Sequence, residues 1–446
     1  MRGHPSACGQ PQSKIECSSL AAKKNTLQAL NDDLVALRHE ARGYGMKSPI
    51  FLTRVVLRNY KSIGACDVRL GPLTYLVGAN GSGKSNFLDA LHLVRDALSG
   101  SLDNALNERG GLMEVRRRSS GHPTNFAIRL EFVLPTGQVG FYAFKVGALT
   151  GRGYEVQTEK CVIGGVGKGP FFHVQRGVLT DSSETTFPAM TPDRLALVSA
   201  SGMTVFRPVF DALTGMGFYN LNPKLMRDPQ KPQDGRMLKP LGENITSVIG
   251  YLERVAPENL RLIESYLQTV VPMMHGLERK QIGPLETLEF RQEVAGAQAP
   301  WRFPAQNMSD GTLRALGVLT ALFQGNKDHA PSLIGIEEPE TALHPAASAA
   351  LREALTKASE TTQVIVTSHS PELLDDRNIQ PEHILAVISE GGDTRIGPLD
   401  AASVSVMREH LFSAGELLRL NQLKPDDAFF RKQTATQADL FGELEL

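Results

Sequence analysis

The stretch Gly78-Ala79-Asn80-Gly81-Ser82-Gly83-Lys84-Ser85 decides the fold of this chain. It fits the pattern Gly-x-x-x-x-Gly-Lys-Ser without a gap and lies between an apolar run at 73–77 and a helical pattern at 86–91. This order predicts a phosphate-binding P-loop, because glycines let successive backbone N–H groups face phosphate oxygens. The following helix points its positive end at the same anion.

The P-loop pattern also predicts which side chains meet a nucleotide. Lys84 would neutralise the β- and γ-phosphates of ATP, and the Ser85 hydroxyl would ligate Mg²⁺. A chance glycine-rich turn is the alternative, but three more phosphate-handling segments follow in the chain. The expected nucleotide contacts in this stretch are Asn80, Gly81, Ser82, Gly83, Lys84, Ser85 and Asn86.

The composition is that of an ordinary globular protein. The chain has 446 residues, of which 41% are hydrophobic and 21% charged, and this length is typical of one to three domains. A net charge of −1 argues against an overall cationic nucleic-acid binder, so any DNA contact would be local. Four scattered cysteines indicate a reducing compartment, and no run approaches ~20 apolar residues. We expect a cytoplasmic protein without a membrane partner.

The first 45 residues differ from the rest. Leucines at 27, 30, 34 and 37 recur at helical spacing with charges between them, which predicts an amphipathic helix able to bind a partner. Equally, Met46 is a candidate natural start, because the β-pattern begins immediately after it. Both interpretations of residues 1–45 stay open.

The remaining chain divides into four predicted regions. Residues 46–163 form a first ATPase lobe with the P-loop and antiparallel strands, of which Asn125–Val133 is the clearest. Residues 164–300 form an insertion or helical lobe, with helix from about Asn244 to Met274 and no sustained heptads. Residues 301–400 form a second ATPase lobe, and 401–446 form a C-terminal tail.

A second phosphate-binding segment is predicted at 307–316. Ser309 or Asp310 is a natural helix N-cap, and an apolar stripe follows it. Alone this is an ordinary helix start. Beside a P-loop it is a second helix N-terminus able to bind a phosphate, with Ser309, Asp310 and Gly311 as the candidate contacts.

Two further segments bring acid and imidazole groups to strand ends. Residues 333–340 form an apolar strand ending in carboxylates, which predicts that Glu337 holds Mg²⁺ and Glu338 polarises the attacking water. A charged loop is the alternative. Residues 363–371 deliver His369 at the tip of a buried strand, where it can contact the γ-phosphate or the water. A serine–histidine hydrolase is disfavoured, because no Gly-x-Ser-x-Gly elbow accompanies the histidine.

Together the four segments resemble the ABC-type ATPase heads of the SMC, RecF and OLD-nuclease group, in particular small prokaryotic AAA-labelled ATPases without coiled-coil arms. The resemblance covers most of 50–400 and is weak over 164–300. It implies an α/β P-loop NTPase fold, that is, an ABC/RecF-like head with a mixed sheet, an antiparallel β subdomain and a helical insertion.

The resemblance also implies an assembly and further contacts. Lys61 and Ser62 would touch the nucleotide, Ser309-Asp310-Gly311 would reach the ATP of a second subunit, and His369 matches the switch histidine. Two ATP molecules would be sandwiched in a head-to-tail homodimer, or in a larger assembly built from it. Glu337 stands where many members have Asp, and no residue is assigned to the Q-loop glutamine.

Candidate effectors are less defined. The segment 384–393 invites comparison with a Toprim nuclease, but a hairpin turning at Gly391-Gly392 is the better interpretation, so that a separate nuclease subunit would cut any DNA. The segment Gln437–Phe441 resembles the Gln-x-x-Leu-Phe peptide that docks on the bacterial sliding clamp, although such short matches also arise by chance. A DNA-facing patch, or merely solvated surface, is predicted from Arg116, Arg117, Arg118, Lys224, Arg227, Lys231, Arg236 and Lys239.

Two functions follow as hypotheses. The first is an ATP-hydrolysing head that dimerises on ATP and couples turnover to DNA or a partner nuclease, in phage defence or DNA repair. The second is a nucleotide-gated scaffold that binds ATP with little turnover and sequesters a toxic partner.

Overall fold

A computed structural model describes residues 50–442, except 120, 122, 150, 152, 165–168, 326–329 and 436–439. All of these residues belong to one compact unit, Pro49–Glu443. The predicted N-terminal extension at 1–45 lies outside the described residues, as do the first three positions of the clamp-like segment, 437–439.

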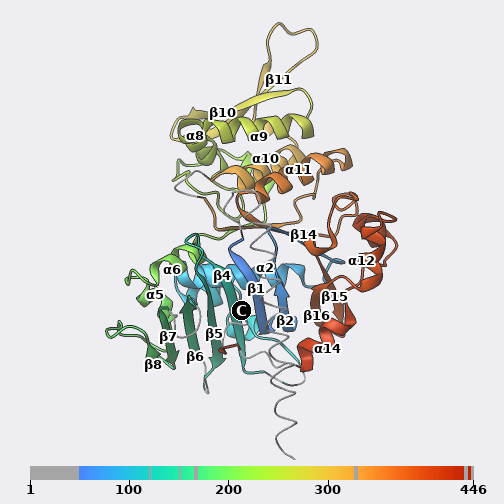
Figure 1. Cartoon of the computed structure of the whole chain (residues 1–446). Helices are drawn as coiled ribbons and strands as arrows, with labels where there is room; N and C mark the ends of the chain where they lie inside the picture. Colours follow the sequence, from blue (N-terminus) through green and yellow to red (C-terminus); the bar gives the residue numbers. More distant parts are fainter. Residues whose placement is uncertain are drawn as a thin grey trace, which may run out of the picture. The chain divides into compact units, whose positions relative to one another are not determined.

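A six-stranded mixed sheet carries the P-loop (Figure 1). Its strands, in order across the sheet, are β16 (Asp393–Pro398), β15 (Ile384–Glu390), β3 (Leu73–Val77), β14 (Gln363–Ser368), β13 (Leu333–Glu337) and β9 (Gly217–Tyr219). The strands from β15 to β9 are parallel, and β16 returns antiparallel from the predicted glycine hairpin. The carboxyl ends of β3, β14 and β13 therefore meet at one edge of the sheet, where ligands of open α/β sheets bind.

The apolar runs of these strands are buried on both faces. In β3, Leu76 packs into one core cluster, while Tyr75 and Val77 pack into another. The same alternation occurs in β14, where Ile365 faces the first cluster and Val366 the second. Side chains on a strand alternate between its faces, so a continuous apolar run is the pattern of a strand covered on both sides.

A seven-stranded antiparallel sheet covers one side of the sheet that carries the P-loop. Its order is β2 (Ile63–Arg69), β1 (Leu52–Tyr60), β4 (Asn125–Val133), β5 (Val139–Ala148), β6 (Tyr154–Ile163), β7 (Phe171–Gln175) and β8 (Val178–Ser182). The predicted strand at Asn125–Val133 is confirmed. Between this sheet and the P-loop sheet lies α2 (Lys84–Ser99), whose Phe87, Leu91 and Val94 are fully buried. Each such side chain contributes about 1.5–3 kcal/mol through burial.

Helices and a small sheet cover the other side. The predicted helix from Asn244 forms two helices, α8 (Ile245–Val255) and α9 (Pro257–Val270), because Pro257 lacks the N–H that would continue α8. The sheet of β10 (Met274–Ile282), β11 (Leu285–Gln292) and β12 (Trp301–Pro304) was not predicted. Figure 1 shows β10 beside α8 and α9, which it contacts.

Two further helices pack against α9: α10 (Asp310–Phe323) and α11 (Ser348–Ser359). The shorter helices are α3 (Leu102–Asn107), α4 (Leu112–Val115), α5 (Ala196–Ala200), α6 (Arg207–Thr214), α7 (Pro223–Arg227), α12 (Ala401–Arg408), α13 (Ala414–Arg419) and α14 (Asp427–Ala435).

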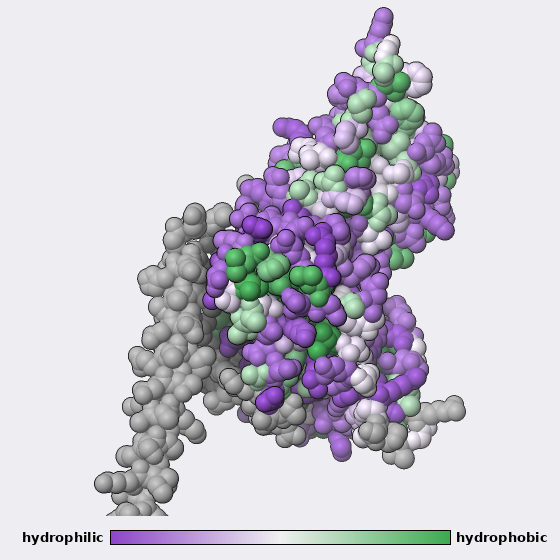
Figure 2. Space-filling model, turned by 90° about the vertical axis from the view of Figure 1, so that its right-hand side faces the viewer, coloured by the Kyte–Doolittle hydropathy of each residue, from purple (hydrophilic) through white to green (hydrophobic). Residues whose placement is uncertain are grey.

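The face of the described part that Figure 2 shows is mainly polar. Figure 2 turns the side bearing α12 toward the viewer and shows hydrophobic side chains gathered among polar ones. Leu411, Phe412 and Leu420, next to α12 and α13, are among the exposed apolar residues. No helix in the described ranges combines the length and hydrophobicity that a membrane crossing requires.

Candidate nucleotide-binding site

The P-loop connects β3 to α2 and is shaped by glycine. Gly83 adopts φ +103°, and a Cβ there would lie 2.1 Å from Thr394 Oγ1 of β16. A Cβ at Gly78 would lie 2.1 Å from the Val387 carbonyl oxygen of β15. The β15–β16 hairpin therefore presses against the loop so closely that both positions require glycine.

The P-loop lysine is held in the loop by main-chain carbonyls. Lys84 Nζ donates to Gly78 O at 2.8 Å and to Ala79 O at 3.0 Å. Burial lowers the pKa of Lys84, and the nearby carboxylates, Glu338 first among them, oppose that effect. The Lys84 ammonium is buried next to the exposed loop residues Asn80 and Gly81, where it can bind phosphate oxygens.

Other polar groups of the loop are arranged around it. Ser82 Oγ is buried and has no hydrogen-bond partner among the described residues, which marks a polar atom available to a phosphate. Asn80 and Gly81 are exposed. Asn86 Nδ2 donates to Ser62 Oγ at 2.6 Å, so this predicted pair of contacts lies together.

The predicted metal ligands lie together at the edge of the sheet. Ser85 Oγ donates to Glu337 Oε2 at 3.0 Å across a sequence separation of 252 residues. Burial raises the pKa of Glu337, and the hydrogen bond from Ser85 opposes that rise. A hydroxyl and a carboxylate are the oxygen ligands that Mg²⁺ prefers, so the two side chains fit this ion.

The predicted catalytic pair is also brought together. Glu338 Oε1 lies 3.1 Å from His369 Nδ1, without the alignment of a hydrogen bond. Glu338 adopts φ +43°, and its N–H donates to the Thr367 carbonyl at 3.0 Å. A left-handed glutamate is strained, and such strain is held only where the surroundings dictate it. Thr367 of β14 thus fixes the loop that carries Glu338.

Lys61 was expected to contact the nucleotide, and the structure gives it a neighbour on α2. Lys61 Nζ lies 2.5 Å from Asp89 Oδ2, and Asp89 also accepts from Tyr60 and Arg109 at 2.7 and 2.8 Å. Desolvation works against the ionised Asp89, but Arg109 and Lys61 outweigh it and lower its pKa. A direct nucleotide contact by Lys61 stays a prediction.

The predicted signature segment begins α10. Ser309 is the N-cap, and its Oγ accepts from Thr312 N at 3.1 Å. A Cβ at Gly311 would lie 2.5 Å from Ala342 O, so the helix start packs on the loop after β13. Ser309 and Asp310 are exposed, and within the described ranges no hydrogen bond or ion pair joins them to the P-loop.

Several residues of the site were not predicted. Ser368 Oγ donates to Glu340 Oε1 at 2.6 Å, which ties the β14 end to the loop after β13. Thr394 Oγ1 donates to Ser82 O at 2.9 Å. Asn220 directly follows β9 and is exposed beside β13, where Tyr219 pairs with Ile336. Only Glu340 carried a local signal, as the third acid of its motif.

Four of the eight residues of the predicted basic patch form ion pairs with nearby carboxylates. Ion pairs join Arg117 to Asp393 at 3.2 Å, Arg118 to Glu114, Arg227 to Asp310, and Arg236 to Asp234 at 3.7 Å. DNA binding by this set stays a prediction.

The described end of the clamp-like segment is hydrogen-bonded to strands of the antiparallel sheet. Arg129 Nη1 donates to the carbonyl oxygens of Leu440 and Gly442 at 3.3 and 2.9 Å, and Lys160 Nζ donates to that of Phe441 at 2.8 Å. These contacts hold residues 440–442 on the antiparallel sheet.

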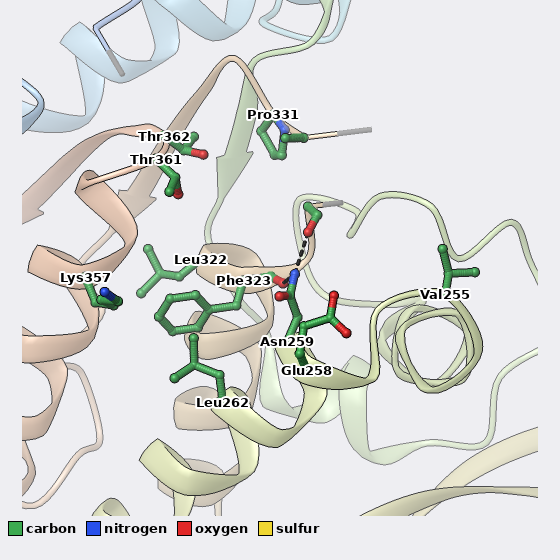
Figure 3. Close-up of a pocket in the computed structure, with 12 residues that line it drawn as sticks. Val255, Glu258, Asn259, Leu262, Leu322, Phe323, Pro331, Lys357, Thr361 and Thr362 are labelled. Atoms are coloured by element: carbon green, nitrogen blue, oxygen red, sulfur yellow. Dashed lines mark hydrogen bonds between the residues drawn. The ribbon is translucent and has the colours of Figure 1, made fainter. Parts of the chain in front are cut away.

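A separate cavity lies in the helical part, away from these residues. Figure 3 shows side chains that line it from α9, α10 and α11. Its volume is about 650 Å³. Asn259 Nδ2 donates there to the Phe323 carbonyl at 3.0 Å. No predicted site residue lines it.

Comparisons with known proteins agree with the fold. A family model described as "AAA domain, putative AbiEii toxin, Type IV TA system" matches residues 73–149 and 260–375. An SMC head bound to the C-terminal winged-helix domain of ScpA is similar over 80% of this chain and 99% of its own, with 14% identity and a TM-score of 0.52. An SMC head from Pyrococcus furiosus, bound to the C-terminal domain of ScpA, covers 81% of this chain and 99% of its own, with 12% identity and a TM-score of 0.51. A comparison with curated sequences finds no match.

Proposed function

We propose that this chain, whose fold is similar to that of SMC heads and whose sequence matches an AAA-domain family model, is an ABC-type ATPase that binds ATP with Mg²⁺ and hydrolyses the bond to its γ-phosphate. One observation carries the proposal. The Ser85 hydroxyl and the Glu337 carboxylate, 252 residues apart in the chain, meet at 3.0 Å beside the P-loop lysine. A glycine-rich loop that bound no nucleotide would not need a hydroxyl and a carboxylate in contact beside its lysine.

The proposed chemistry assigns one task to each side chain. Ser85 and Glu337 would hold Mg²⁺, which supplies charge neutralisation on the phosphate oxygens. Lys84 would exchange its two carbonyl partners for phosphate oxygens. Glu338 would take the proton of a water whose oxygen attacks the γ-phosphorus, while the bond to the β-phosphate oxygen breaks and ADP leaves. His369 would orient that water or the γ-phosphate.

We further propose that two copies close head to tail around two ATP molecules. The P-loop is exposed at Asn80 and Gly81, and α10 is exposed at its start, at Ser309 and Asp310. Within the described residues no hydrogen bond or ion pair joins these two surfaces of one chain, as expected if each completes a site on a second copy. Closing and opening would be the output, coupled to DNA or to a partner nuclease in phage defence or DNA repair.

A nucleotide-gated scaffold is the second candidate. The matching family model is described as a putative toxin of a type IV toxin–antitoxin system. That description names the toxin itself, and only its toxin–antitoxin setting is shared with an ATP-bound dimer that turns over slowly and sequesters a toxic partner. The SMC head crystallised with a ScpA domain is a related fold that binds another protein.

Steady-state ATP hydrolysis with and without duplex DNA tests the proposal. Lys84→Ala is the blank, and Lys357→Ala, at the exposed end of α11, is the matched control. We expect turnover in the wild type and the control, a rise with DNA, and loss in Lys84→Ala. ATP binding with negligible turnover in all conditions would contradict hydrolysis and favour the scaffold.

A further inference from the structure

The guanidinium of Arg227 contacts the residues on both sides of the N-cap of α10. Arg227, the last residue of α7, donates from Nη2 to the Met308 carbonyl oxygen at 3.1 Å and to Asp310 Oδ1. Met308 precedes the N-cap Ser309, and Asp310 follows it. The guanidinium therefore spans the N-cap that would face the ATP of a second copy.

The negative charge of Asp310 would oppose phosphate binding at the start of α10, and the ion pair with Arg227 offsets that charge. A helix N-terminus favours anions because of its free N–H groups and its dipole. Asp310 already places a carboxylate in the first turn, and its side chain is 55% exposed. An incoming triphosphate would be repelled by that charge unless a cation neutralised it.

The position of Arg227 is built into the fold. Asn222 caps α7 by accepting from Lys224 N at 3.0 Å, and Pro223 stands at the first helical position. Met226 is buried, and its Cε would lie 2.8 Å from a Cβ at Gly317 of α10. A short capped helix packed on α10 thus fixes the guanidinium, which is itself only 27% exposed.

We propose that Arg227 is a positioning residue that neutralises Asp310 and so lets the start of α10 accept the polyphosphate of ATP held by a second copy. This inference rests on the proposed ATP-dependent dimer. It assigns Arg227 to the nucleotide site of the dimer instead of to a DNA-facing patch. The negative charge removed from the interface, rather than the packing of the arginine, is the decisive quantity.

A charge cycle tests the inference. Dimer formation is measured against ATP concentration by analytical ultracentrifugation for the wild type, Arg227→Met, Arg227→Lys, Asp310→Asn and the double variant. Arg227→Met should raise the ATP concentration for half-maximal dimerisation on the order of tenfold, because it leaves Asp310 unpaired. The double variant should return close to the wild type, and Arg227→Lys should lie between. Circular dichroism and thermal unfolding verify that each variant folds.

The outcomes separate this inference from the proposed function. Wild-type dimers that are indifferent to Arg227→Met, or a loss that Asp310→Asn does not restore, would overturn the role of charge. A wild type that never dimerises with ATP would overturn the proposed dimer and this inference with it. Restoration by Asp310→Asn is not expected if Arg227 only stabilises the packing of α7.

Discussion

Glu159 places an ionisable carboxyl group in a fully buried position. Its side chain is fully buried on β6, and its carboxylate accepts from Tyr142 Oη at 2.9 Å, Ala196 N at 2.5 Å and Leu197 N at 2.8 Å. Burial raises the pKa of Glu159 to about 7, although these hydrogen bonds oppose the rise. The carboxyl group fastens the start of α5 to the antiparallel sheet.

The raised pKa makes the stability of the fold depend on pH. The unfolded carboxyl ionises near its ordinary value of 4.5, while the folded one stays protonated to about 7. Stability from this group is therefore fully present at low pH and is lost as the pH rises to about 7. We expect the wild-type free energy of unfolding to fall by about 3 kcal/mol more than that of Glu159→Gln over this range.

Urea unfolding between pH 4 and pH 8 measures this difference. The exposed Glu390→Gln is the matched control and should follow the wild type. Parallel pH profiles for the wild type and Glu159→Gln would contradict the prediction.

At the scale of elements, one side chain links the two large sheets. Gln363, the first residue of β14, is fully buried. Its Oε1 accepts from Phe51 N and Leu52 N at 3.1 and 2.8 Å, and its Nε2 donates to Leu52 O and Gly71 O at 2.8 and 2.9 Å. The amide thus pairs main-chain groups that neither sheet can satisfy alone.

Gln363→Ala should destabilise the fold without touching the nucleotide site. It leaves buried N–H and C=O groups unpaired, which costs on the order of 1–3 kcal/mol for each group that water does not reach. We expect the free energy of unfolding in urea to fall by about 3 kcal/mol. Gln380→Ala, whose side chain is exposed, is the control. Equal stability of the two variants would show that the amide is not a link between the sheets.

At the scale of the whole molecule, the two halves of each proposed site belong to different copies. Lys84 serves the nucleotide of its own chain, whereas Ser309 would serve that of the partner. Inactive chains that each lack one of these groups should therefore complement each other. The mixed dimer has one site that lacks both groups and one site that lacks neither.

Mixing purified Lys84→Ala and Ser309→Ala should restore ATP hydrolysis. With equal amounts and random pairing, half of the dimers are mixed, and each has one intact site of two. The expected rate is roughly a quarter of the wild-type rate, if the two sites act independently. The double variant Lys84→Ala/Ser309→Ala mixed with itself is the control. Activity no greater than the sum of the separate variants would contradict sites shared between copies.

Local patterns of the sequence determined much of this protein. Local patterns predicted the P-loop with its flanking strand and helix, the acidic end of β13 and the histidine after β14. Each of these features depends on neighbours within about ten residues in the chain. The antiparallel strand Asn125–Val133 and the hairpin at Gly391-Gly392 were confirmed for the same reason. The sheet β10–β12 was not predicted, since its hairpin gave no clear strand alternation in the sequence.

Only the tertiary structure decided which distant groups meet. Ser85 and Glu337 were expected together from their motifs, but the partners of Lys61 and Arg227 were not, and both cations are paired with carboxylates. An ion pair depends on the path of the chain between its members, and no local pattern records that path. The sequence alone therefore determined the kinds of chemical group at this site, and the fold decided which of them are neutralised, buried or left facing outward, because those properties depend on packing.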